Sequence, residues 1–219
     1  MSRACQIDVG HRGAARHFLR ATGSALLAAL ALTGAKAVPG PAVANLVVLR
    51  TREGEIRIRL HPREAPIACA NFRRLVQAGF YDHTYFHRAL PAFVIQGGDP
   101  NTARNADPAD DGLGGAGYRL PAEAGGPAVR GSVAMARLPD ALNPSHENDG
   151  CQFYIVLRRQ PSLDATGGTV FGDVIAGMDV VERIAALAYQ KDVLQAAAGA
   201  NPQDRARIVR ASLEPVAAR

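Results

Sequence analysis

The sequence lacks a hydrophobic run long enough to span a membrane. Its apolar stretch ALLAALAL at residues 25–32 is too short for a stable transmembrane helix. Arginines precede this stretch and small residues follow it, which is typical of a secretory signal peptide, and two A-x-A patterns predict cleavage after Ala37 or Ala44. We therefore expect a signal peptide and a short linker in residues 1–44, one domain in residues 45–219, a periplasmic location, and no stable membrane association after cleavage. An uncleaved anchor or an amphipathic leader is the alternative, because the arginine-bearing segment is long.

Without this leader, the sequence also has almost no excess of charge of either sign. The whole chain carries 25 Lys and Arg against 20 Asp and Glu, a net charge of +5. Five of these bases and one of these acids precede residue 45, which leaves 20 bases against 19 acids and a net charge of +1. A domain that binds nucleic acid needs a basic surface. The balance of charges therefore argues against a nucleic-acid partner.

Cysteine is sparse as well. Cys5 would leave with the signal peptide, so Cys69 and Cys151 remain. Two cysteines do not make a disulfide framework for a domain of this size, and their spacing does not decide whether they form one bridge. The sequence contains no C-x-x-C pair and no zinc-ligand spacing.

Two other motifs are incomplete. The segment GLGGAGY at residues 112–118 lacks the lysine of a P-loop, so we interpret it as glycine-rich turn geometry. His146 and Glu147 do not begin an H-E-x-x-H motif, because glycine occupies position 150. The sequence therefore supports neither a phosphate-binding loop nor a zinc protease.

Short strands dominate the part of the chain that follows the leader. Ile56, Ile58 and Leu60 alternate with arginines, which predicts a strand with one buried face, paired in a hairpin with NLVVLR through a turn at Gly54. Further strands are indicated by the segments FHRAL, AFVIQG, GSVAMAR, CQFYIVL, TVFGDVI and RIVRASL.

Two helices complete the expected fold. One begins at Pro66, which suits a first helical turn, and ends near Gly79, and apolar spacing predicts the other at residues 178–190. Residues 100–130 are rich in Gly, Pro, Asp and Ala and are expected to form a long loop. Many short strands separated by turns favour a mostly β fold, either a closed antiparallel barrel or a sandwich.

The stretch FHRALPAFVIQGGD at residues 86–99 resembles the signature of cyclophilin-type peptidyl-prolyl cis-trans isomerases. Three further parts of the sequence follow in the order that this family uses: GLGGAGYRLPAE, then GSVAMAR with CQFYIVL, then TVFGDVIAGMDVVERI. The resemblance covers about residues 45–215 and is greatest to the bacterial periplasmic branch. It implies a closed eight-stranded antiparallel barrel capped by two α-helices, in agreement with the strands and helices expected above.

The resemblance assigns the catalytic role to Arg88. Rotation about a peptide bond has a barrier of roughly 18–20 kcal/mol, and the prolyl nitrogen recovers its lone pair in the twisted transition state. A fixed guanidinium donor aimed at that nitrogen stabilises the twisted state more than either planar state, which is the condition for catalysis. No covalent intermediate, metal or cofactor is expected. We expect a monomeric isomerase that acts on Xaa-Pro bonds of proline-containing polypeptides and assists the folding of exported proteins.

The resemblance also implies polar anchors for the substrate backbone. Gln96 and Gln152 match the amides that hold the substrate carbonyl and help to place the arginine. Ala136 and Arg137 match the edge along which the substrate backbone runs. His87 is interpreted as a structural hydrogen bonder, because isomerisation requires no proton abstraction.

A proline pocket is implied beside these anchors. Alternation along CQFYIVL places Phe153 and Tyr154 on opposite faces of a strand, which favours Tyr154 as the pocket residue. The expected lining is Phe93, Val94, Tyr154 and Leu163.

Two positions depart from the family pattern. Ser162 and Gly168 occupy places where many family members carry aromatic residues or histidine. These departures keep open an alternative function, a cyclophilin-fold module that binds proline peptides, or a holdase, with little turnover. The presence of Arg88 and both glutamines favours the enzyme.

Overall fold

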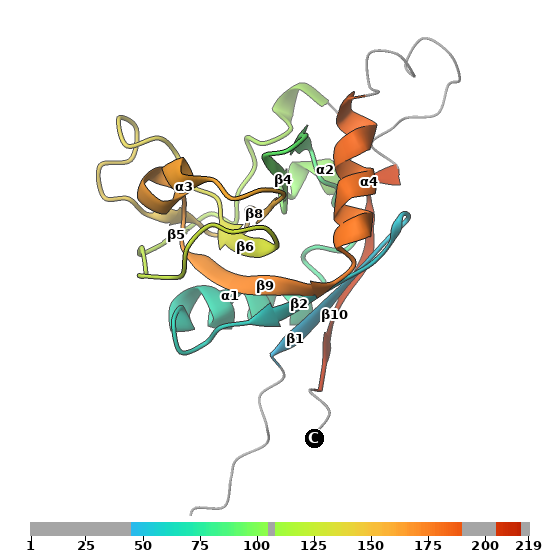
Figure 1. Cartoon of the computed structure of the whole chain (residues 1–219), viewed down its shortest axis with the longest axis horizontal. Helices are drawn as coiled ribbons and strands as arrows, with labels where there is room; N and C mark the ends of the chain where they lie inside the picture. The colour runs from blue at the N-terminus through green and yellow to red at the C-terminus, as the bar shows by residue number, and fades with distance from the viewer. Residues whose placement is uncertain (1–44, 105–107, 190–204, 216–219) are drawn as a thin grey trace, which may run out of the picture. The chain divides into compact units, whose positions relative to one another are not determined.

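The computed structural model describes residues 45–104, 108–189 and 205–215, shown in colour in Figure 1. The predicted signal peptide and both cleavage positions, Ala37 and Ala44, lie outside the described residues. Among the helices of the described part, none is long and apolar enough to cross a membrane.

Eight antiparallel strands form one curled sheet, in the order β10-β1-β2-β9-β6-β8-β4-β3. Figure 1 shows β9, β2, β1 and β10 running together along one part of the curled sheet. Every strand segment expected from the sequence is present in it. The strands are β1 (Leu46–Thr51), β2 (Gly54–Leu60), β3 (Arg88–Leu90), β4 (Val94–Gly97), β6 (Ser132–Met135), β8 (Phe153–Val156), β9 (Val170–Ala176) and β10 (Ile208–Glu214).

The first hairpin shows why these strands form. Ile56 and Ile58 are fully buried and Leu60 is 3% exposed, whereas Arg59 between them is exposed, so the alternation of the sequence is the alternation of the strand's two faces. Gly54 takes a left-handed backbone angle, φ 135°, where β1 turns into β2. The predicted hairpin is confirmed.

The expected closed barrel is not formed. β10 and β3 are the two edges of the sheet, and in the described part of the chain no strand ladder joins them. An isolated bridge between Tyr85 and Arg207 connects the segments that precede these strands. Three backbone hydrogen bonds cross near the bridge, from His83 N–H to the Ile208 carbonyl, from Ile208 N–H to the Thr84 carbonyl and from Phe86 N–H to the Ala206 carbonyl, but they lie before β3 and do not continue along it as a ladder. The fold is therefore mostly β, with a curled open sheet.

Both expected helices are present and pack against the sheet. α1 (Pro66–Gln77) has proline in its first turn and packs against β10 and β9, and α4 (Met178–Tyr189) packs against β2, β3 and β4 (Figure 1). The segment at 100–130 was expected to be a loop, but it also contains short regular elements. The short elements of the described chain are α2 (Asn101–Arg104), a 3-10 turn (Pro108–Asp110), α3 (Pro161–Thr166), and the two-stranded sheet of β5 (Arg119–Leu120) and β7 (Asn148–Asp149).

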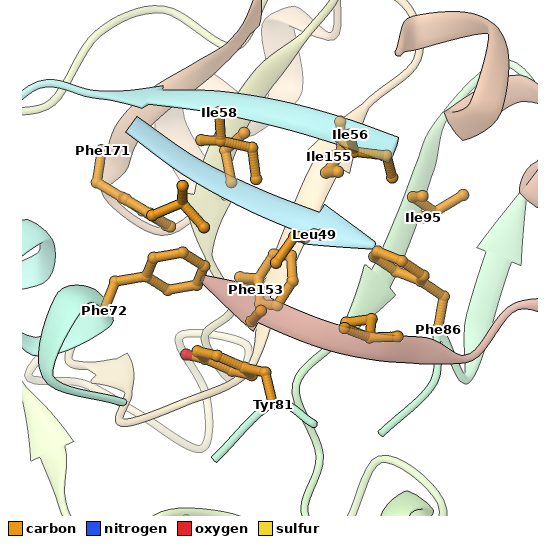
Figure 2. Close-up of a cluster of buried hydrophobic side chains, with 14 of the residues drawn as sticks. Leu49, Ile56, Ile58, Phe72, Tyr81, Phe86, Ile95, Phe153, Ile155 and Phe171 are labelled. Carbon is orange, nitrogen blue, oxygen red and sulfur yellow. The ribbon is translucent and has the colours of Figure 1, made fainter. Parts of the chain in front are cut away.

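Aromatic rings hold α1 to the sheet. The ring of Phe153 from β8 meets those of Phe72 from α1, Tyr81 and Phe86 edge-on, at centroid distances of 5.3, 5.5 and 5.9 Å. Figure 2 shows these rings gathered with Phe171 inside the core. Such pairs contribute about 0.5–1.5 kcal/mol each beyond the burial of their surface.

The two cysteines belong to the same core. Cys69 and Cys151 are both buried free thiols, so the question of a bridge between them is settled against a disulfide. The Cys69 thiol donates a hydrogen bond to the carbonyl of Phe171 at 3.2 Å, and burial raises its pKa to about 11. It is therefore protonated and unreactive at neutral pH.

Candidate functional site

The candidate site lies on the face of the sheet opposite the main core. Along β8, Phe153 and Ile155 belong to the main core, while Tyr154 and Val156 belong to a second apolar cluster with Val94. The opposite orientation of Phe153 and Tyr154 is as predicted. The second cluster forms the floor on which the site is built.

Strand register brings the polar and apolar parts of the site together. Arg88 on β3 is the register partner of Gln96 on β4, Gln96 is the partner of Tyr154 on β8, and Tyr154 is the partner of Ala134 on β6. Register partners project to the same face of a sheet. Residues from four strands therefore form one row across this face.

A pocket of about 120 Å³ lies over this row. Every site residue predicted from the sequence contributes to its wall except Gln152. The lining residues are Arg88, Phe93, Val94, Gln96, Ala136, Arg137, Tyr154, Leu163, Thr166, Gly167 and Gly168.

Gln152 lies directly behind the pocket, in contact with Gln96. The Gln96 side-chain N–H donates to Oε1 of Gln152 at 2.9 Å, and Oε1 of Gln96 accepts from Nη1 of Arg88 at 3.3 Å. Gln152 also lines an adjoining cavity of about 290 Å³, which shares Gln96, Ala136 and Arg137 with the first pocket. The two predicted amides thus form a chain that ends at the arginine.

Arg88 is exposed and carries an available charge. In the described part of the chain no carboxylate pairs with its guanidinium, and no acidic residue lines the pocket. Since only Gln96 engages the guanidinium there and Arg88 lines the pocket, the other N–H groups are available to a ligand.

Arg137 is a structural member of the wall. Its side chain is 6% exposed and donates to the carbonyl of Thr166 at 2.8 Å, to Asp140 at 2.6 Å and to His146 at 2.8 Å. These bonds fix α3 against the loop that follows β6. The Ala136 N–H donates to the Gln152 carbonyl and the Ala136 carbonyl accepts from the Asp149 N–H, so the N–H at Ala136 is not available to a substrate backbone.

Gly167 and Gly168 line the pocket with backbone alone. A Cβ at Gly168 would lie 1.9 Å from the Met135 carbonyl oxygen and 2.7 Å from the side-chain oxygen of Asn148, so no other residue fits there. Ser162, the other departure from the family pattern, is exposed on α3 and is not part of the pocket wall.

Sequence reasoning missed Thr166 and Gly167, which enter the wall at the end of α3. Pro161 in the first turn of that helix is a signal that could have located it. The interpretation of His87 was wrong for the described residues, because neither of its ring nitrogens has a hydrogen-bond partner there.

No group of three or more His, Cys, Asp or Glu in the described residues could hold a metal ion. The arrangement instead combines an apolar pocket, one available guanidinium and a chain of amides. It suits recognition of a neutral, mostly apolar group and stabilisation of a hydrogen-bond acceptor beside that group.

The curled antiparallel sheet and this pocket define a prolyl isomerase of the cyclophilin class. The family model described as cyclophilin type peptidyl-prolyl cis-trans isomerase/CLD matches residues 46–213, so the chain belongs to that family. A probable peptidyl-prolyl cis-trans isomerase of Brucella suis is 36% identical over 173 residues, which are 76% of this chain and 85% of that protein. A peptidyl-prolyl cis-trans isomerase of Acinetobacter baylyi is 37% identical over 159 residues, covering 69% of this chain and 78% of its own length.

A solved structure has the same fold. The cyclophilin type peptidyl-prolyl cis-trans isomerase of Cryptosporidium parvum, crystallised in the presence of the dipeptide Ala-Pro, superposes with a TM-score of 0.57 at 24% identity. The match covers 78% of this chain and 99% of that structure.

Proposed function

We propose that the pocket binds the proline of an Xaa-Pro segment and that Arg88 catalyses rotation about the peptide bond before it. The observation that carries the proposal is the placement of Arg88, held by Gln96 beside a pocket floored by Val94 and Tyr154. An apolar floor accepts a pyrrolidine ring, and a guanidinium beside it faces the imide nitrogen. The Ala-Pro used with the Cryptosporidium parvum protein is a ligand of this kind.

The chemistry requires only differential binding. In the planar ground states the prolyl nitrogen lone pair is delocalised and accepts hydrogen bonds poorly, whereas in the twisted transition state it is localised. A donor fixed beside the pocket therefore lowers the barrier. Because arginine stays charged and presents several N–H groups in one plane, Arg88 bonds Gln96 with one N–H and directs others to the ligand.

The test is a coupled isomerisation assay on Xaa-Pro peptides with Arg88→Ala. We expect kcat/KM to fall by about tenfold to a thousandfold, corresponding to about 1.4–4 kcal/mol. Arg63→Ala is the matched control, because Arg63 is exposed in a turn and does not line the pocket. Equal activity in both variants, with unchanged circular dichroism, would refute the role of Arg88. A peptide-binding module would bind in all three proteins and accelerate isomerisation in none.

We further propose that the protein is exported and acts on other exported proteins in the periplasm. The arginine-bearing leader, its apolar stretch and the A-x-A patterns support this proposal. Expression in a Gram-negative host should yield periplasmic protein that begins after Ala37 or Ala44. N-terminal sequencing of the periplasmic fraction tests the proposal, and an intact Met1 on cytosolic protein would contradict it.

A further inference from the structure

We propose that Asp99 is a positioning residue for the isomerase reaction. It holds the glycine-rich loop that orients two glutamine amides, and through them it places Arg88. The proposal rests on the proposed function, since it concerns how the catalytic guanidinium is held.

The first step is the environment of the Asp99 carboxylate, which is fully buried. Its Oδ1 accepts the backbone N–H of Asn101 at 2.8 Å, and its Oδ2 accepts the backbone N–H groups of Gly112 and Gly114, the latter at 3.2 Å. Within the described residues no lysine or arginine forms an ion pair with it. Burial of a carboxylate costs free energy unless hydrogen-bond donors surround it. The loop must therefore keep its N–H groups on Asp99, which holds it beside the end of β4.

The second step is the short distance between the backbone of Gly114 in the loop and the Asp99 carboxylate. A Cβ at Gly114 would lie 2.0 Å from Oδ1 of Asp99 and 2.9 Å from the side chain of Asn101. Only glycine allows the backbone to approach the carboxylate this closely. The glycine-rich segment GLGGAGY therefore has a specific partner in addition to its turn geometry.

The third step is the direction of the amides. The carbonyl oxygens of Gly112 and Gly114 accept two hydrogen bonds from Nε2 of Gln152, at 3.0 and 2.7 Å. A carbonyl can only accept, so Gln152 must turn its NH₂ group to the loop and its oxygen to Gln96. Gln96 must then turn its NH₂ group to Gln152, which leaves its oxygen for Arg88.

The loop therefore sets the polarity of the whole chain of hydrogen bonds. If the loop carbonyls moved away, Gln152 could rotate and present its NH₂ group to Gln96, and Gln96 would then turn its own NH₂ group to the guanidinium. Two donors facing each other repel, and Arg88 would leave its place beside the pocket. Asp99 does not contact Arg88, so any effect it has on catalysis passes through Gln152 and Gln96.

The main experiment compares Asp99→Asn with wild type in the coupled assay. Asparagine replaces one acceptor oxygen by a donor NH₂ group, so the loop loses part of its anchor. We expect kcat to fall about tenfold with KM nearly unchanged, because the apolar floor is intact; this is about 1.4 kcal/mol. Asp82→Asn is the matched control: Asp82 also accepts a backbone N–H, from Ala211 at 2.8 Å, but does not line the pocket. It should lower stability and leave kcat unchanged.

A double-mutant cycle separates positioning from a merely structural role. In a Gln152→Ala background the chain is already cut, so Asp99→Asn should lower kcat no further. An equal loss in both backgrounds, or a kcat for Asp99→Asn no lower than that of Asp82→Asn, would overturn the proposal.

Two further measurements cover failure of that variant or of the assay. If Asp99→Asn does not fold, Gly114→Ala disturbs the same contact and should cause a similar loss of kcat, whereas Gly126→Ala, with nothing within 4 Å of the added Cβ, should not. If the wild type has no isomerase activity, the proposed function fails, but NMR still decides the present inference. The side-chain amide signals of Gln152 and the Nε–H signal of Arg88 should shift in Asp99→Asn and not in Asp82→Asn, and unchanged signals would refute it.

Discussion

A Cβ at Gly167 would lie 2.6 Å from the hydroxyl oxygen of Tyr154, so the tyrosine occupies the space that a side chain at position 167 would need. The Tyr154 hydroxyl is buried and has no hydrogen-bond partner in the described residues. Burial raises its pKa to about 12 although the nearby backbone N–H of Gly168 opposes the shift, so it remains protonated at neutral pH. The Tyr154 hydroxyl can occupy its buried position only because residue 167 has no side chain.

We therefore expect Gly167→Ala to destabilise the protein by about 1–3 kcal/mol through overpacking. Gly167 has φ −78° and ψ 170°, which alanine adopts without strain, so steric contact is the cause. The added methyl would also lie 2.4 Å from the Leu163 carbonyl oxygen, so the end of α3 must shift and activity should fall. Urea unfolding and the coupled assay measure the two effects.

Tyr154→Phe provides the control and a partial rescue. Removal of an unpaired buried hydroxyl should leave stability unchanged or slightly higher. In combination with Gly167→Ala it should recover part of the lost stability, because one of the two close contacts disappears. No recovery in the double variant would show that the contact with Leu163 alone accounts for the cost.

His87 should make stability depend on pH. Burial lowers the pKa of His87 below its ordinary value of 6.5, Arg88 lowers it further, and Asp99 and Asp111 oppose the shift. Between the folded-state pKa and about 6.5 the unfolded chain binds more protons, so the free energy of unfolding is largest above about pH 6.5 and falls as the pH drops through that window. His87→Gln should remove this contribution.

The measurement is urea unfolding between about pH 5 and 7.5, with wild type and variant compared at each pH. His83→Asn is the control, because His83 is exposed and asparagine tolerates its left-handed φ of 68°. The control should keep the wild-type slope. Identical slopes for wild type and His87→Gln would contradict the prediction.

Most of the sheet could be predicted because each strand carries its own pattern of alternation. The elements that were missed are short: α3 has six residues, α2 four, the 3-10 turn three, and β5 and β7 two each, too few to show a period. Whether β10 and β3 pair to close the sheet depends on the turn before β3 and on contacts between segments far apart in the sequence. The local sequence pattern does not predict such contacts.

The pocket was predictable for a different reason. Arg88, Gln96 and Tyr154 lie within recognisable segments, and strand register then brings them together. The hydrogen bonds from Asp99 to Gly112 and Gly114 link two segments through backbone groups, which every residue possesses. The sequence therefore indicated the glycines of the loop and not the carboxylate that they contact.

The last prediction concerns Ser162, which is exposed on α3 next to Leu163 of the pocket wall. In cyclophilins that bind the cyclic peptide cyclosporin tightly, the resemblance implies an indole at this position that supplies apolar contact and an N–H hydrogen bond. Serine lacks the aromatic surface, worth roughly 1.5–3 kcal/mol, and the N–H donor, worth about 0.5–1.5 kcal/mol. We therefore expect an active isomerase whose affinity for cyclosporin is about ten- to a thousandfold weaker, and tighter inhibition of Ser162→Trp.

Ala165→Trp, on an exposed position of the same helix that does not line the pocket, is the control and should not gain affinity. Titration of the three proteins with cyclosporin during turnover measures this, and strong inhibition of the unmodified protein would show that another residue takes the place of the indole.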